Sequence, residues 1–246
     1  MGAADTLPAV DSGDSPTCAL AMTAPFLAPA SRCTAWFGDR LSDAVKLALM
    51  VGFESSGFER SAFASGPMLI VANHVSLLDT LAIRYALPAA VRARTATVGA
   101  RDFFAPSPTD RGIRRALRAC TCSYVTNAYR VCLIGRGDDM GDGIPTITSV
   151  LREGWNVILF PEGTRSRSGQ MGRFRMGVAH LAATTGVPVL PVGIRGTEGL
   201  MPVGSPVIRH GRVVVRAGVP TRIEQGEAHG AFLQRMRAEI NGLLAP

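Results

Sequence analysis

The chain has 246 residues, of which 47% are hydrophobic and 18% are charged. This is enough apolar material for one large domain or two small ones, and it excludes a disordered chain, a collagen and a coiled coil. The sequence contains 26 Lys and Arg residues against 19 Asp and Glu residues, and the net charge of +7 favours anionic partners such as phosphorylated metabolites, phospholipid headgroups or nucleic acid.

Residues 1–35 contain Gly, Ala, Pro, Ser and Asp without hydrophobic periodicity, so we expect a mobile leader followed by a single domain over residues 36–246. The apolar spacing of Leu41–Phe53 predicts a short helix, which would either pack on the domain or insert into a membrane interface. No run reaches the roughly 18 apolar residues of a transmembrane helix, and five irregularly spaced cysteines fit idle thiols in a reducing compartment. We therefore expect a cytoplasmic protein, peripherally associated with the membrane.

Beyond residue 55, apolar runs and turn residues alternate at the spacing typical of α/β proteins. Strands are predicted at Met68–Ala72, Thr95–Val98, Val131–Ile134, Val157–Phe160, Val187–Ile194 and Val213–Ala217. Helices are predicted at Ser76–Leu87, Asp110–Ala119, Pro145–Arg152, Met176–Thr185 and His229–Leu244. The pattern predicts an α/β fold, with a mixed, largely parallel β-sheet flanked by helices.

The first group of residues suited to catalysis, Asn73 to Asp79, follows the strand at Met68–Ala72. Ligands of open α/β sheets usually bind at such strand ends. With His74 in the turn, the Asp79 carboxylate can fold back toward the imidazole, fix its tautomer and stabilise imidazolium. The alternative is a capping box with Ser76 as N-cap and Asp79 at N3, in which His74 is only a hydrogen-bonded turn residue.

The second group is the sequence FPEGTRS at residues 160–166, at the end of the strand Val157–Phe160. Gly163 allows a close backbone approach, Thr164 offers a hydroxyl, and the planar fork of Arg165 suits a phosphate. Further positive charge follows at Arg167, Arg173 and Arg175. A solvated basic loop is the alternative interpretation.

Together these motifs resemble the glycerolipid acyltransferase family, typified by 1-acyl-sn-glycerol-3-phosphate acyltransferase. That family is marked by N-H-x-x-x-x-D, an Arg-containing strand-end block, F-P-E-G-T-R-S and a Val-Pro-rich strand. The corresponding segments here occur in the same order within about residues 55–200: Asn73–Asp79, Ile134–Arg136, Phe160–Ser166 and Val187–Val192. The second block departs from the pattern, because many members have an aromatic residue and an Asp before its Arg. The resemblance implies a glycerol-3-phosphate acyltransferase-like fold.

The resemblance also implies an O-acyltransferase that moves a fatty acyl chain from acyl-CoA or acyl-carrier protein to a lysophospholipid hydroxyl, above all that of 1-acylglycerol 3-phosphate, giving phosphatidate. His74 would be the general base and Asp79 would orient it. Substrate-binding residues would be Arg136, Glu162, Gly163, Thr164, Arg165 and Arg175. Neither a metal nor a cofactor is implied. Alternatives are the same chemistry on another lysolipid, an aminolipid or a glycolipid, and a non-catalytic lipid-binding member of the fold.

The predicted helix at Asp110–Ala119 carries a basic face. This face could be solvated, or it could bind anionic lipid, the phosphates of CoA or an acidic carrier protein. Nucleic acid is not expected as a partner, because no binding motif or aromatic platform accompanies the charge. We expect this helix and Leu41–Phe53 to hold the protein reversibly on a membrane surface. The arginines concerned are Arg111, Arg114, Arg115 and Arg118.

Overall fold

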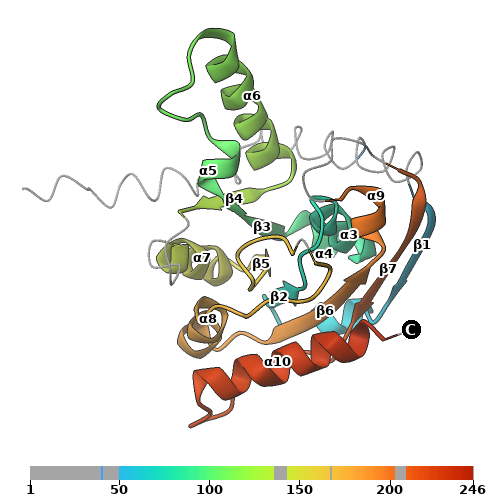
Figure 1. The fold of residues 1–246 in the computed structure, drawn as a ribbon. Helices are drawn as coiled ribbons and strands as arrows, with labels where there is room; N and C mark the ends of the chain where they lie inside the picture. The colour runs from blue at the N-terminus through green and yellow to red at the C-terminus, as the bar shows by residue number, and fades with distance from the viewer. Residues whose placement is uncertain (1–39, 41–49, 136–142, 167, 203–208, 246) are drawn as a thin grey trace, which may run out of the picture.

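The computed structural model describes residues 40, 50–135, 143–166, 168–202 and 209–245 (Figure 1). The predicted leader at residues 1–35 and residues 41–49 of the predicted helix lie outside these ranges, so both remain predictions. Within the described ranges, no helix combines the length and apolar character needed to cross a membrane.

One mixed sheet runs through the molecule, with the strand order β1-β7-β6-β2-β5-β3-β4. Neighbouring strands are parallel, except that β6 and β7 are antiparallel. The strands are β1 (Met50–Ser56), β2 (Leu69–Ala72), β3 (Thr95–Ala100), β4 (Val131–Ile134), β5 (Asn156–Leu159), β6 (Val189–Arg195) and β7 (Gly211–Ala217). The predicted α/β class and largely parallel sheet are confirmed.

Helices cover both faces of this sheet (Figure 1). On one face lie α7 (Gly143–Arg152), α8 (Gly177–Thr185) and α10 (His229–Leu243). On the other lie α3 (Asp79–Ala86), α4 (Ala89–Ala93) and the short α9 (Thr197–Leu200), and a 3-10 turn, η2 (Arg60–Phe63), precedes β2. The remaining helices, α5 (Arg101–Phe104) and α6 (Gly112–Ala128), connect β3 to β4, and α6 projects from the body of the domain.

Strand β2 explains why the central strands are continuous apolar runs. Leu69 and Val71 point into the core beneath α7, α8 and α10, whereas Ile70 and Ala72 point into the core beneath α3. All four side chains are fully buried. A strand with helices on both faces has no solvent-facing side, so it needs no polar alternation.

The predicted helix Leu41–Phe53 is wrong at its carboxyl end. Residues from Met50 onward form β1, which pairs in parallel with β7 and places Phe53 opposite Val213. The edge of the sheet supplies hydrogen-bond partners for this segment, and this tertiary pairing overrides the local helical spacing.

The basic helix is longer than the predicted Asp110–Ala119, because α6 continues to Ala128. Its second half contains Thr and Asn, which favour helix interiors poorly. Here the side chains of Thr121 and Asn127 donate to the backbone carbonyls of Leu117 and Ser123, four residues earlier. These polar groups therefore have partners within the helix.

The parallel strands bring the predicted catalytic segments together. The segment from Asn73 follows β2, and residues 160–166 follow the adjacent strand β5, with Val71 paired opposite Leu159. Because the two strands are parallel, both segments leave the same edge of the sheet.

Candidate active site

His74 and Asp79 form a hydrogen-bonded pair at this edge. The Nδ1 atom of His74 lies 2.8 Å from Oδ2 of Asp79. The His74 side chain is 18% exposed, whereas the Asp79 side chain is fully buried. With Nδ1 held by the carboxylate, the other ring nitrogen, Nε2, is left to exchange a proton with a ligand.

Asp79 also caps the turn that carries His74. Its Oδ2 atom accepts hydrogen bonds from the backbone N–H groups of Val75, at 2.7 Å, and Ser76, at 2.8 Å. The pairing with His74 and half of the capping box therefore occur together. The helix predicted from Ser76 starts later, at Asp79, because residues 76–78 form a turn in which the Ser76 hydroxyl accepts the Leu78 N–H.

The FPEGTRS segment fixes His74 from the other side. Oε1 of Glu162 accepts the His74 backbone N–H at 2.9 Å, and the Ser166 N–H donates to the His74 carbonyl at 2.8 Å. The imidazole stacks on the Phe160 ring, with 4.0 Å between the ring centroids and 16° between the planes. Phe160 was predicted to end the strand, but β5 ends at Leu159 and Phe160 turns beneath the histidine.

Both carboxylate oxygens of Glu162 are bound to backbone. The second oxygen, Oε2, accepts the Gly172 N–H at 2.8 Å, so Glu162 links the turn at His74 to the loop that precedes α8. The side chain is buried. Glu162 therefore connects the two motifs through hydrogen bonds to the backbone. Its predicted contact with the acceptor stays a prediction.

Gly163 is required by the shape of the turn. Its φ of +69° lies in the left-handed region, and a Cβ there would meet the Nε atom of Arg175 at 2.6 Å. The absence of a side chain thus lets the Arg175 guanidinium lie across the turn.

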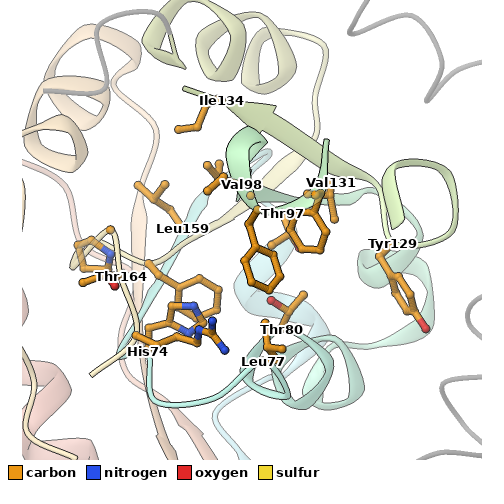
Figure 2. Close-up of a pocket in the computed structure, with 18 of the residues that line it drawn as sticks. His74, Leu77, Thr80, Thr97, Val98, Tyr129, Val131, Ile134, Leu159 and Thr164 are labelled. Carbon is orange, nitrogen blue, oxygen red and sulfur yellow. The ribbon is translucent and has the colours of Figure 1, made fainter. Parts of the chain in front are cut away.

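A largely apolar pocket of about 370 Å³ opens beside the histidine (Figure 2). His74 and Thr164 lie on one side of it and Tyr129 on the opposite side. The wall between them is mostly apolar and includes Leu77, Val98, Val131, Ile134 and Leu159. A space of this kind suits a hydrocarbon chain, which would then end near the His74 imidazole.

Two arginines contribute to the same wall, Arg165 and Arg175. The Arg165 guanidinium carbon lies 5.3 Å from the centroid of the Phe103 ring, which belongs to α5 and also lines the pocket. The predicted ligands Gly163, Thr164, Arg165 and Arg175 are therefore gathered with His74 around one cavity. Arg136 lies outside the described residues, although Ile134 and Gly135 immediately before it line the pocket.

Asn73 ties the catalytic turn to the sheet. Its Nδ2 donates to the Ile194 carbonyl at 2.9 Å, and its Oδ1 accepts the Ile194 N–H at 2.8 Å. The side chain thus hydrogen-bonds to β6 as a backbone would, directly after β2 ends. The sequence alone identifies Asn73 as part of the motif, and the structure shows that its side-chain amide binds the backbone of the adjacent strand β6.

Thr197 is a site residue that sequence reasoning missed. Its hydroxyl donates to Oδ1 of Asp79 at 2.5 Å, across 118 residues of sequence, and both side chains are fully buried. Gly196 makes the connection possible, because its φ is +92° and a Cβ would collide with the Arg212 carbonyl. No local motif predicts this contact, because it forms only when α9 packs next to α3 in the folded chain.

The buried cysteine Cys132 is not suited to act as a nucleophile. Cys132 is buried in β4, and burial raises the pKa of its thiol to about 12. It therefore stays protonated at neutral pH. Among the described residues, no three His, Cys, Asp or Glu side chains gather as metal ligands would.

Removing the Thr197 hydroxyl should destabilise the protein. Thr197→Val is nearly isosteric but leaves Oδ1 of Asp79 buried without its donor, so we expect the free energy of unfolding to fall by about 1–3 kcal/mol. Thr197→Ser keeps the donor and should lose much less. Urea unfolding of the three proteins provides the measurement, and equal stability of the Val and Ser variants would contradict the interpretation.

With this geometry established, comparison with known proteins gives a consistent result. A family model described as Acyltransferase matches residues 55–195, which is more than half of the chain. The crystal structure of the 1-acyl-sn-glycerophosphate acyltransferase PlsC from Thermotoga maritima is similar, with a TM-score of 0.63 and 22% identity over 92% of this chain and 86% of that one. At this identity, the structural likeness shows the fold.

Three curated relatives, all 1-acyl-sn-glycerol-3-phosphate acyltransferases, illustrate the sequence similarity. The chain is 43% identical over 75 residues to the chloroplastic LPAT1 of Arabidopsis thaliana, covering 30% of this chain and 21% of that protein. It is 30% identical over 132 residues to the human alpha enzyme, covering 52% and 40%. It is 23% identical over 174 residues to the enzyme of Cocos nucifera, covering 69% and 50%. The alignments thus span at most half of these three relatives.

On the match to residues 55–195 and the motifs around His74 and Arg165, the chain belongs to the acyltransferase family that includes the 1-acyl-sn-glycerol-3-phosphate acyltransferases.

Proposed function

We propose that this protein transfers a fatty acyl chain from a thioester to the hydroxyl of a lysophospholipid, with 1-acylglycerol 3-phosphate as the acceptor and phosphatidate as the product. The observation that carries the proposal is the position of the His74–Asp79 pair at an apolar pocket whose rim holds two arginines. A general base, a chain-sized apolar space and phosphate-binding groups are the parts that this reaction needs.

In the proposed reaction, Nε2 of His74 removes the proton from the acceptor hydroxyl as its oxygen attacks the thioester carbonyl. The tetrahedral oxyanion then collapses and expels the thiolate, which takes the proton back from the imidazolium. Asp79 holds Nδ1 and stabilises the positive charge that His74 carries between these steps. No acyl-enzyme forms, because the acceptor oxygen attacks the thioester directly.

The acceptor phosphate is assigned to Arg165 and Arg175, with Thr164 as a further ligand and, from the family motif alone, Arg136. Arginine suits this task because its planar fork binds two phosphate oxygens at once. The donor is acyl-CoA or acyl-carrier protein. Both present a thioester to His74, and they differ in groups that would lie outside the pocket. The protein would act at the cytoplasmic surface of a membrane, where its lipid substrates lie.

Replacing the general base should abolish turnover. His74→Ala is expected to lower the rate of acyl transfer about 10²- to 10⁴-fold, because no other described residue that lines the pocket has a side chain suited to accept the hydroxyl proton. The measurement is an assay of purified enzyme with acyl-CoA, acyl-carrier protein and a panel of lysolipids, read by lipid mass spectrometry. His180→Ala, at an exposed histidine on α8, is the matched control. Turnover of His74→Ala at the wild-type rate would refute the assignment, and a wild-type protein inactive with the whole panel would favour the non-catalytic lipid-binding alternative.

The phosphate assignment can be tested separately through Arg165→Lys. This change keeps the charge but removes the two-pronged donor, so we expect kcat/KM for phosphate-bearing acceptors to fall roughly tenfold to a hundredfold, with the KM for the thioester unchanged. Arg173→Lys is the control, because Arg173 is an exposed residue between the FPEGTRS segment and α8. If the acceptor kinetics do not change, Arg165 is not the phosphate ligand and Arg136 becomes the first candidate.

A further inference from the structure

The amino-terminal half of α6 is exposed on every side. Residues 112–117 are all exposed, and the helix stands out from the body of the domain together with α5 (Figure 1). Ile113 is 79% exposed and Leu117 is 62% exposed. Helices in proteins owe most of their stability to a packed apolar face, which this part of α6 does not have.

The apolar side chains of α6 form a stripe that leads back to the pocket. At 100° per residue, Ile113, Leu117 and Tyr124 lie within about 40° of one another on the helix. Tyr124 packs edge-to-face on Tyr129, with 5.9 Å between the ring centroids, and Tyr129 lines the pocket. Exposed apolar surface thus runs along α6 toward the cavity that contains His74.

The opposite side of α6 is basic. Arg115 projects about 160° or more from each member of the stripe by the same geometry, and α6 contains no acidic residue. Arg111 is exposed and directly precedes α6, which begins at Gly112. Arg118 is bound to Asp110, at 2.9 Å, and this hydrogen bond and the Ser107 N–H hold the pKa of the Asp110 carboxyl below its usual range. The ion pair fixes the start of the helix and leaves the charges of Arg111 and Arg115 facing solvent.

Helix α5, which precedes α6, adds exposed apolar surface at the pocket itself. Phe103 on α5 is 40% exposed, lines the pocket and carries the Arg165 guanidinium on its ring. Of the five large hydrophobic side chains that are exposed in the described ranges, three belong to α5 and α6: Phe103, Ile113 and Leu117. Exposed apolar surface is therefore concentrated on α5 and α6, and Phe103 is the part of it that lines the pocket.

We propose that α6 is an interfacial helix, which inserts Ile113 and Leu117 into the lipid of an anionic membrane, places Arg111 and Arg115 among the headgroups, and sets the pocket mouth at Phe103 against the bilayer. An apolar stripe opposite an arginine face is the pattern of a helix that lies in a membrane interface. The inference rests on the proposed function at one point only: acyl transfer to a lysophospholipid explains why the pocket would face the bilayer. A second copy of the chain fits the surface less well, because it would bring two arginine faces together on molecules that each carry a charge of +7.

The insertion can be observed directly by fluorescence. In the full-length protein, Leu117→Trp should show a blue-shifted emission on vesicles of phosphatidylglycerol and phosphatidylcholine, and brominated lipid should quench it. The matched control is Val219→Trp, at a side chain that is 80% exposed and follows β7, which lies next to the edge strand β1 on the side of the sheet away from β4. The added fluorescence is compared with that of the parent chain. Equal quenching at both positions, or a Leu117→Trp emission that is already blue-shifted without vesicles, would overturn the proposal.

Vesicle sedimentation separates the apolar and charged contributions. Ile113→Ser/Leu117→Ser should lower the partition coefficient by at least about tenfold, whereas Val219→Ser should leave it unchanged. Arg111→Gln/Arg115→Gln should lower it about thirtyfold on anionic vesicles at low salt, and much less at high salt or on phosphatidylcholine alone. Arg60→Gln/Arg152→Gln removes two charges from exposed positions beside the amino ends of β2 and β5, and should have little effect. All these substitutions lie on the surface, so thermal unfolding should be nearly unchanged.

The vesicles contain neither thioester nor acceptor, so the result stands whether or not the proposed acyl transfer occurs. Binding to neutral and anionic vesicles that is equal and independent of salt would overturn the proposal, as would wild-type binding from the α6 variants. If the arginine variants lose binding to an acidic acyl-carrier protein while their vesicle binding is intact, the basic face serves the donor and not the membrane.

Discussion

The Asp79 carboxylate is a charge with no access to water, and the site is arranged around the need to compensate it. Removing a carboxylate from water is costly unless donors replace the lost hydration. Four donors surround it here, supplied by the backbone of Val75 and Ser76, the ring of His74 and the hydroxyl of Thr197. Each donor belongs to a segment that must be folded correctly, so one buried group fixes the catalytic turn, the start of α3 and the position of α9.

This arrangement makes the histidine rigid without burying its reactive nitrogen. His74 is held at its N–H, its carbonyl, its Nδ1 atom and one face of its ring. Only two of these four contacts, the Asp79 and Glu162 carboxylates, come from charged side chains, and both are buried. A ring fixed in this way loses little conformational freedom when a ligand binds, which is the condition for effective general-base catalysis.

The sequence predicts the parts of this site that depend on neighbouring residues in the chain. It misses the parts that depend on contacts between segments far apart in the sequence. The strand before His74 and the strand before Phe160 are evident as short apolar runs, because helices bury both faces of the sheet there. The folding back of Asp79 was predicted from the turn, although the choice between a dyad and a cap stayed open. The structure shows one oxygen of Asp79 serving both roles, which no spacing rule could indicate.

The errors have the same physical origin. Met50–Phe53 has helical spacing but becomes part of β1, because β7, more than 150 residues later, offers a parallel partner. Thr197 has no motif around it and reaches Asp79 only because Gly196 lets the chain turn after β6. Glu162 is a different case: the family resemblance implies an acceptor ligand, which stays a prediction, and the structure adds that its two oxygens hold the backbone of His74 and Gly172. Within a recognised motif, residue type alone does not separate a side chain that binds substrate from one that shapes the loop.

The distribution of apolar and charged side chains around the pocket determines the orientation in which an amphiphile can bind. Apolar wall surrounds the cavity, whereas the charged side chains among its lining, Arg165 and Arg175, lie on the loop that also holds His74. A hydrocarbon chain would lose free energy by lying against the arginines, and an anionic headgroup would lose more by entering the apolar wall. Under the proposed function, this separation places the chain in the cavity and the phosphate at the loop, so that the junction between them lies at the imidazole. Phe103 lines the cavity and is 40% exposed, so under the proposed insertion of α6 a substrate that leaves the bilayer would enter the cavity past this ring.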